Sequence, residues 1–82
     1  MKFTRYFHAM RNRPDRCQIR MEWIERAVND PDQEAIQADG RIRRWLWVPE
    51  VRKHLRVVLL DDRETVHNAF FDRGHEEVSD ED

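Results

Sequence analysis

Histidine and arginine are the residues of this sequence whose chemistry could serve catalysis or binding. The histidines are His8, His54, His67 and His75. Histidine titrates near neutral pH, so it can act as a general acid or a general base. None of the four shares with Cys17, or with another histidine, the short spacing typical of a metal site. The sequence therefore predicts no bound metal and no cofactor.

Two of these histidines, His8 and His67, are the candidate catalytic residues. His8 falls in a segment expected to be helical, with arginines one turn away on either side. It could transfer protons beside guanidinium groups that bind a phosphate, or it could be an exposed helical histidine without a catalytic role. His67 falls on an expected strand, on one face with Ala69 and Phe71. The alternative to catalysis there is a hydrogen-bonded histidine of the core.

Arginines and tryptophans interleave on two expected neighbouring strands. Arg41 and Arg43 follow an expected turn, and Trp45 and Trp47 come next on the same strand. Arg56 lies on the following strand, so the set could form a cationic strip across the sheet. Arginine beside aromatic rings can bind phosphate and stack on bases, and the same residue types anchor protein interfaces. We expect Arg41, Arg43 and Arg56 to bind substrate, and Trp45 and Trp47 to be interface anchors.

Two N-terminal helices are expected to position these residues. Apolar side chains recur every three or four positions over residues 4–11 and again over residues 21–28, which is the period of an amphipathic helix. The second helix should place Trp23 in the core. Asp15, with Gln18 three residues later, has the form of a capping box and could start this helix earlier.

The period of the pattern changes to two after Gln33, which indicates strands. Asp39-Gly40 lies between apolar residues and predicts a hairpin with a two-residue turn, in which glycine supplies the positive φ. Further strands are expected over residues 41–48, 55–60 and 65–71. The expected fold class is α+β, with two N-terminal helices packed on a four-stranded antiparallel meander sheet.

The 82 residues are enough for one hydrophobic core and too few for two. Residues 75–82 contain five of the 17 acidic residues and none of the 15 basic ones. This composition predicts a single domain over residues 1–74 and a disordered acidic tail over residues 75–82. Without the tail the chain is mildly basic, which permits a polyanionic partner such as RNA.

The single cysteine, Cys17, cannot form an intramolecular disulfide, and we expect it to be a small buried residue in a reducing compartment. The longest apolar run, over residues 57–60, is far shorter than the roughly 20 residues needed to span a bilayer. The expected location is the cytoplasm, with no membrane partner. The tryptophan face and the third strand indicate apolar surface on both sides of the sheet, so we expect a homodimer or a protein partner to cover the second side.

Five segments spread along the chain form one pattern: His8-Ala9 and residues 21–27, 36–43, 55–58 and 65–70. Together they resemble a family of short bacterial proteins grouped with the RelE/ParE toxin fold. The resemblance covers roughly residues 2–73. It implies a toxin-type α+β domain that is neutralised by a small antitoxin encoded alongside.

The resemblance also implies an activity. RelE-like proteins are endoribonucleases and ParE-like relatives act on gyrase, and the group's His-Ala pair and following arginine correspond to His8-Ala9 and Arg16. The leading hypothesis is an RNA endonuclease in which arginines hold the phosphate, His8 or His67 moves protons, and the 2′-hydroxyl of the substrate attacks without a metal. The alternative is a non-catalytic interaction module that binds a small antitoxin-like protein or a second copy of the chain.

Overall fold

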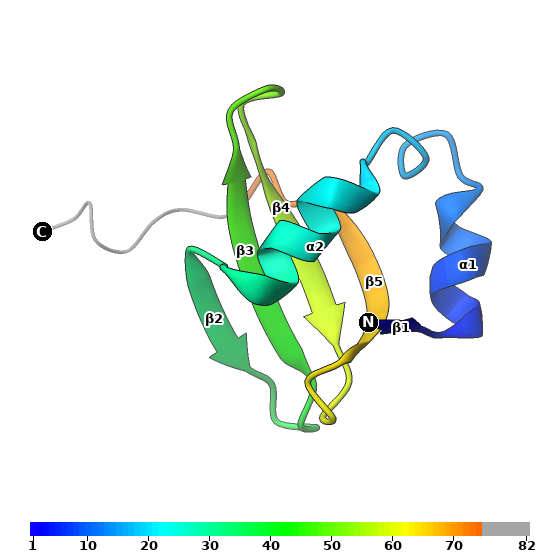
Figure 1. Ribbon diagram of the computed structural model, residues 1–82, viewed down its shortest axis with the longest axis vertical. Helices are drawn as coiled ribbons and strands as arrows, with labels where there is room; N and C mark the ends of the chain where they lie inside the picture. Colours follow the sequence, from blue (N-terminus) through cyan, green and yellow to red (C-terminus); the bar gives the residue numbers. More distant parts are fainter. Residues whose placement is uncertain (75–82) are drawn as a thin grey trace, which may run out of the picture.

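A five-stranded mixed sheet in the order β1-β5-β4-β3-β2 forms the frame of the molecule (Figure 1). The structure is a computed structural model and describes residues 1–74, so the expected disordered tail lies outside the described residues. The strands are β1 (Lys2–Phe3), β2 (Gln33–Ile36), β3 (Ile42–Val48), β4 (Lys53–Leu59) and β5 (Thr65–Phe71).

The α+β class is as predicted, but the four-stranded antiparallel meander is wrong. The first strand, β1, pairs with β5 in parallel, and Phe3 lies opposite Val66. The Thr4 N–H donates to the Val66 carbonyl at 3.1 Å, which extends this pairing. A strand of two residues is too short to show the alternation of apolar and polar side chains that predicts a strand. Phe3 also fits the apolar spacing of the first helix, so the sequence assigns it to that pattern.

The two helices are α1 (Arg5–Arg11) and α2 (Met21–Asn29). The Thr4 hydroxyl caps α1 by accepting a hydrogen bond from the Phe7 N–H at 3.1 Å. The earlier start of the second helix, suggested by a capping box at Asp15, does not occur: Arg20 is the N-cap and makes no side-chain cap bond. The segment between the helices forms turns over residues 12–18.

The hydrophobic core lies between the helices and one face of the sheet. Trp23 of α2 is in this core as predicted, with 5% of its surface exposed and its ring centre 6.2 Å from that of Phe71. Figure 1 shows α2 lying across β3 and β4, with α1 beside β5. The other core side chains are those of Phe7, Ile19, Ile24, Ala27, Ile42, Leu46, Val48, Leu55, Val57, Leu59, Val66 and Ala69.

The hairpin between β2 and β3 forms where the sequence predicted it, with Gly40 at a φ of +92°. Its loop is longer than the predicted two residues. The Gln37 N–H donates to the Arg41 carbonyl at 2.7 Å, and the Gly40 N–H donates to the Gln37 carbonyl at 2.9 Å. Residues 38–40 therefore form a three-residue loop that ends in a left-handed glycine, which is the next most common way to close a hairpin.

A β-bulge interrupts the alternation of β5. Leu59 pairs with Val66, whereas its neighbour Val58 pairs with Asn68, so β5 contains one extra residue at this point. Val66 and Ala69 are both buried although they are three residues apart. His67 therefore does not share a face with Ala69 as simple alternation predicted, and it lies outside the core.

The sheet face opposite the helices is called the helix-free face below, because no helix of residues 1–74 covers it (Figure 1). Neither α1 nor α2 is long and apolar enough to cross a membrane.

Candidate nucleic-acid interface

The helix-free face carries the predicted arginines and tryptophans of β3 and β4. Ile42, Leu46 and Val48 of β3 are buried in the core under α2. Because side chains alternate along a strand, Arg43, Trp45 and Trp47 lie on the opposite face. Each of these residues has a partner on β4 that lies on the same face. The pairs are Arg43 with Val58, Trp45 with Arg56, and Trp47 with His54.

Two cations and two aromatic rings alternate in one line across this face. The Arg16 guanidinium lies 5.2 Å from the centre of the Phe70 ring, and the Arg56 guanidinium lies 4.7 Å from the same ring. Arg56 is also 5.9 Å from the Trp45 ring centre. We call Arg16, Phe70, Arg56 and Trp45 the cation–aromatic row. Such contacts each stabilise by roughly 0.5–1 kcal/mol where they are exposed and by more where they are desolvated.

Asp72 fixes one end of the cation–aromatic row. Its Oδ2 accepts a hydrogen bond from Trp45 Nε1 at 3.1 Å and lies 3.5 Å from Arg56 Nε. These contacts and the neighbouring side chains leave only 7% of Trp45 exposed, whereas Trp47 is 39% exposed. Of the two tryptophans predicted as interface anchors, Trp47 is therefore the one with a ring that another molecule can reach.

Arg16 reaches the other end of the cation–aromatic row from the segment between α1 and α2. Its Nη1 donates to Asn68 Oδ1 at 2.8 Å, and Asp15 lies 3.6 Å away. The sequence indicated Arg16 only through the family resemblance. The bulge that places Asn68 and Phe70 beneath it left no trace in the residue pattern.

Arg41 and Arg43 are placed differently on the helix-free face. Arg41 is exposed and lies 3.8 Å from Asp39 in the hairpin loop. Arg43 is half-buried and has no ion pair among residues 1–74. Its guanidinium can therefore bind an anion without first releasing an acidic partner.

His67 lies outside the core and contacts Thr4 and Tyr6. Its Nδ1 is 3.1 Å from the Thr4 hydroxyl oxygen, and its ring stacks on Tyr6 with 4.7 Å between the centroids. Burial lowers the pKa of His67 below its ordinary value, and the Arg41 charge lowers it further. A neutral imidazole is therefore present at pH 7, and Nε2 makes no hydrogen bond within the described part of the chain.

His8, the other candidate catalytic residue, is not beside His67. It is exposed on α1, and its ring centre lies 5.8 Å from Phe3 and 5.9 Å from Phe7. Tyr6 faces His67, and a residue two positions later on a helix points about 200° away. None of the contacts found for His8 in residues 1–74 involves Arg41, Arg43 or Arg56.

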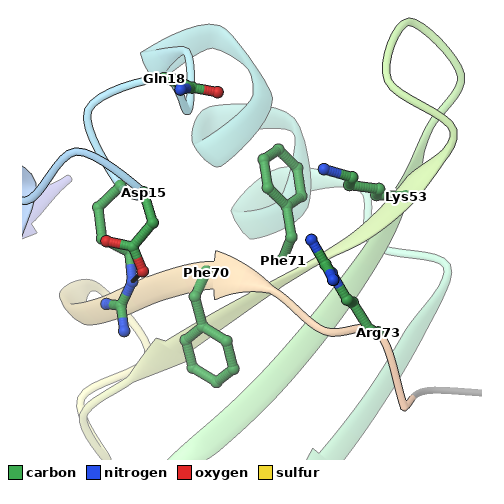
Figure 2. Close-up of a pocket in the computed structure, with 7 residues that line it drawn as sticks. Asp15, Gln18, Lys53, Phe70, Phe71 and Arg73 are labelled. Atoms are coloured by element: carbon green, nitrogen blue, oxygen red, sulfur yellow. Dashed lines mark ion pairs between the residues drawn. The ribbon is translucent and has the colours of Figure 1, made fainter.

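Two pockets flank the end of β5, each lined by Lys53 and Arg73. The first has a volume of about 410 Å³ and is lined by Asp15, Arg16, Gln18, Lys53, Phe70, Phe71 and Arg73. Figure 2 shows Phe70 and Phe71 pointing to opposite sides of β5, with Lys53 and Arg73 near Phe71 and Asp15 across the pocket. The sequence did not predict this pocket, because its residues come from three segments far apart in the chain.

The described residues contain no group of three histidine, cysteine or acidic side chains that could hold a metal ion. Cys17 is exposed, so its predicted burial is wrong, and its thiol lies 3.6 Å from the Pro14 carbonyl oxygen. The turns between the helices carry it at the surface rather than on the inner side of a helix.

Comparison with known family models, with curated proteins and with solved structures finds no match. The RelE/ParE resemblance therefore stays a prediction, and the assignment of a function depends on the geometry of the helix-free face.

Proposed function

We propose that the helix-free face binds single-stranded RNA and that His67 acts there as the base in a cleavage reaction. The observation that carries this proposal is the cation–aromatic row, which lies on the same face as Arg43. An RNA endonuclease of this kind agrees with the toxin-type activity that the RelE resemblance implies, and its place of action would be the cytoplasm.

Binding on this face would combine phosphate contacts with stacking. The exposed Arg41 and half-buried Arg43 supply positive charge, and the Phe70 and Trp47 rings are partly accessible. Single-strand binding proteins pair a positive groove with aromatic platforms, and each stacked base contributes roughly 1–3 kcal/mol. Residues 1–74 hold all 15 basic residues and 12 of the 17 acidic ones, a formal charge of +3. That charge favours an anionic partner.

Cleavage would use the 2′-hydroxyl of the substrate as the nucleophile. Neutral His67 takes the proton of this hydroxyl at Nε2, and the 2′-oxygen then forms a bond to the adjacent phosphorus. The bond from phosphorus to the 5′-oxygen breaks, and the leaving oxygen takes a proton from water. Arg41 would stabilise the extra negative charge on the phosphoryl oxygens. The products are a 2′,3′-cyclic phosphate and a 5′-hydroxyl.

A second candidate function is protein binding through Trp47. This side chain is 39% exposed on the helix-free face, and tryptophan is a typical anchor of protein interfaces. The partner would be a small antitoxin-like protein or a second copy of the chain. Tight binding that depends on Trp47 but not on Arg43, and that survives high salt, would favour this function over RNA binding.

Cleavage of a 12-nucleotide RNA by the purified full chain tests the first proposal. His67→Asn should reduce cleavage by about 100-fold or more, the usual contribution of a general base. His8→Asn is the matched control and should leave the rate unchanged. A 2′-deoxy oligonucleotide of the same sequence lacks the 2′-hydroxyl nucleophile, so it should bind but remain uncut. Equal rates for the His67 variant and the parent would reject the catalytic role.

A further inference from the structure

The pocket at the end of β5 has features of an anion-binding site, and its cations Lys53 and Arg73 take no part in the function proposed for the helix-free face. Three of its lining side chains are cations, Arg16, Lys53 and Arg73, against one carboxylate, that of Asp15. Asp15 is already paired with Arg16 at 3.6 Å and with Arg13 at the same distance. The charges of Lys53 and Arg73 are therefore not neutralised within the pocket.

Lys53 and Arg73 are available to a ligand. Neither forms an ion pair with another of the residues 1–74. The Lys53 ammonium lies 5.2 Å from the centre of the Phe71 ring, which holds it over the pocket without using its three N–H donors. Figure 2 shows Arg73 directed toward the same ring.

Phe70 and Phe71 of β5 line the pocket, and the edge of this strand offers a backbone donor beside it. The Asp72 N–H donates to the His54 carbonyl of β4 at 2.8 Å. In an antiparallel pair successive N–H groups point alternately toward and away from the partner strand. The Phe71 N–H therefore points away from β4, at an edge where β1 does not extend, because β1 pairs only with Thr65 and Val66.

We propose that this pocket binds a phosphomonoester group, the form in which phosphate ends a nucleic-acid strand, through Lys53, Arg73 and the Phe71 N–H. A phosphomonoester carries about 1.5–2 negative charges at pH 7 and has three strong acceptor oxygens, whereas a phosphodiester carries one charge. Two free cations and a backbone donor match the first group better than the second. The pocket borders the helix-free face through Arg16 and Phe70, but Lys53, Arg73 and the Phe71 N–H have no part in the proposed RNA binding. Phosphate binding by these three groups can therefore be measured whether or not that face binds RNA.

An NMR titration of the ¹⁵N-labelled full chain tests the proposal, with methyl phosphate as the monoester and dimethyl phosphate as the diester. Methyl phosphate should shift the Phe71 N–H signal and bind at least about fivefold more tightly than dimethyl phosphate. Lys53→Gln and Arg73→Gln should each weaken methyl phosphate binding by about tenfold, the loss expected for one charged hydrogen bond. Arg63→Gln, at the far end of β5, is the matched control and should leave binding unchanged. Unchanged spectra outside the pocket would show that each variant is folded.

A second arm identifies the source of the group. A 5′-phosphorylated RNA trinucleotide that binds more tightly than both inorganic phosphate and the 5′-hydroxyl trinucleotide would assign the pocket to strand ends. Inorganic phosphate binding as tightly as the trinucleotide would overturn the strand-end assignment. Equal binding of monoester and diester, or signal shifts spread over all surface arginines, would overturn the site itself. Methyl phosphate binding that persists while RNA is not cut would reject the endonuclease proposal and leave this one standing.

Discussion

At the scale of single residues, burial lowers the pKa of His67 and the Arg41 charge lowers it further. Because its pKa is lower in the folded protein than the ordinary value of 6.5, the unfolded chain binds more protons in the interval between the two values. Its contribution to the free energy of unfolding is therefore complete above pH 6.5 and is lost as the pH falls through the folded pKa.

His67→Asn should remove this part of the pH dependence. Thermal unfolding of the parent and the variant between pH 5 and 8 measures it, and we expect the difference in melting temperature to change with pH below about 6.5 and to be constant above it. A difference that stays constant over the whole range would contradict the lowered pKa of His67. His54→Asn serves as a control for histidine replacement on the same face.

Trp23 is the residue for which sequence and structure agree most closely. It flanks the apolar stripe of α2, and it is buried against the sheet beside Phe71. Trp23→Ala should lower the free energy of unfolding by about 3–5 kcal/mol, the usual cost of removing a large buried ring. Chemical denaturation measures this loss. A melting curve equal to that of the parent would place the ring outside the core.

At the scale of elements, the sequence predicts the helices and strands that are long enough to show a periodic pattern of apolar residues. Both helices, the hairpin at Gly40 and the strands β3, β4 and β5 follow from apolar spacing and turn residues. The sequence does not predict the features that depend on only one or two residues. The two-residue strand β1 and the bulge at His67 and Asn68 come from pairing with distant residues, and local pattern contains no information about such pairing.

The loop between β2 and β3 depends on Gly40, whose φ of +92° is rarely adopted by residues with a side chain. An added Cβ would lie 3.6 Å from the Asp61 Cβ, an ordinary contact, so the cost of substitution is a backbone cost. Gly40→Val should reduce stability by more than about 1 kcal/mol, since a β-branched residue is strained at this φ. Urea unfolding measures it, and a stability within about 0.3 kcal/mol of the parent would exclude the left-handed conformation.

The turn between β4 and β5 depends on Asp62. Its carboxylate accepts hydrogen bonds from the Thr65 hydroxyl, the Glu64 N–H and the Thr65 N–H, which lower its pKa from 3.8 to about 2. The stabilisation from Asp62 is therefore complete above pH 3.8 and is lost as the pH falls toward 2. Asp62→Asn should flatten the acid unfolding curve in this interval, whereas Asp61→Asn should not. If the stability of the parent and of Asp62→Asn changed equally with pH in this interval, the lowered pKa of Asp62 would be rejected.

At the scale of the whole molecule, the sheet has a different kind of layer on each side. One face is covered by the helices and forms the core, and the other is covered by its own arginines, which lie over Trp45 and Phe70. The sequence predicts apolar residues on both faces, and a homodimer or a protein partner over the second face stays a prediction. Arg56 lies over Trp45, and Arg16 lies over Phe70 from the loop between α1 and α2. The residue pattern could not predict the second contact, because it joins a loop to a distant strand.

The charge distribution of the whole chain gives a further prediction. Replacing the five acidic residues of positions 75–82 by their amides changes the formal net charge from −2 to +3. Attraction between a protein and an anion depends on net charge and is screened over roughly 10 Å at 0.1 M salt. RNA binding by this variant should be tighter than that of the parent at 20 mM salt, and the two should converge at 0.5 M. Fluorescence anisotropy measures both affinities, and equal affinities at low salt would contradict an electrostatic contribution.

The most direct test of RNA binding on the helix-free face is the salt dependence of the dissociation constant for a 12-nucleotide RNA, measured for the parent, Arg43→Gln and Arg26→Gln. Arg43 lies on the helix-free face, and Arg26 is exposed on α2, on the other side of the sheet. We predict that log Kd rises linearly with log salt, that Arg43→Gln lowers the slope by about 0.7, the value for one phosphate contact on a single strand, and that Arg26→Gln leaves it unchanged. Equal slopes for all three proteins, or a loss of slope with Arg26→Gln alone, would contradict the assignment of RNA binding to this face.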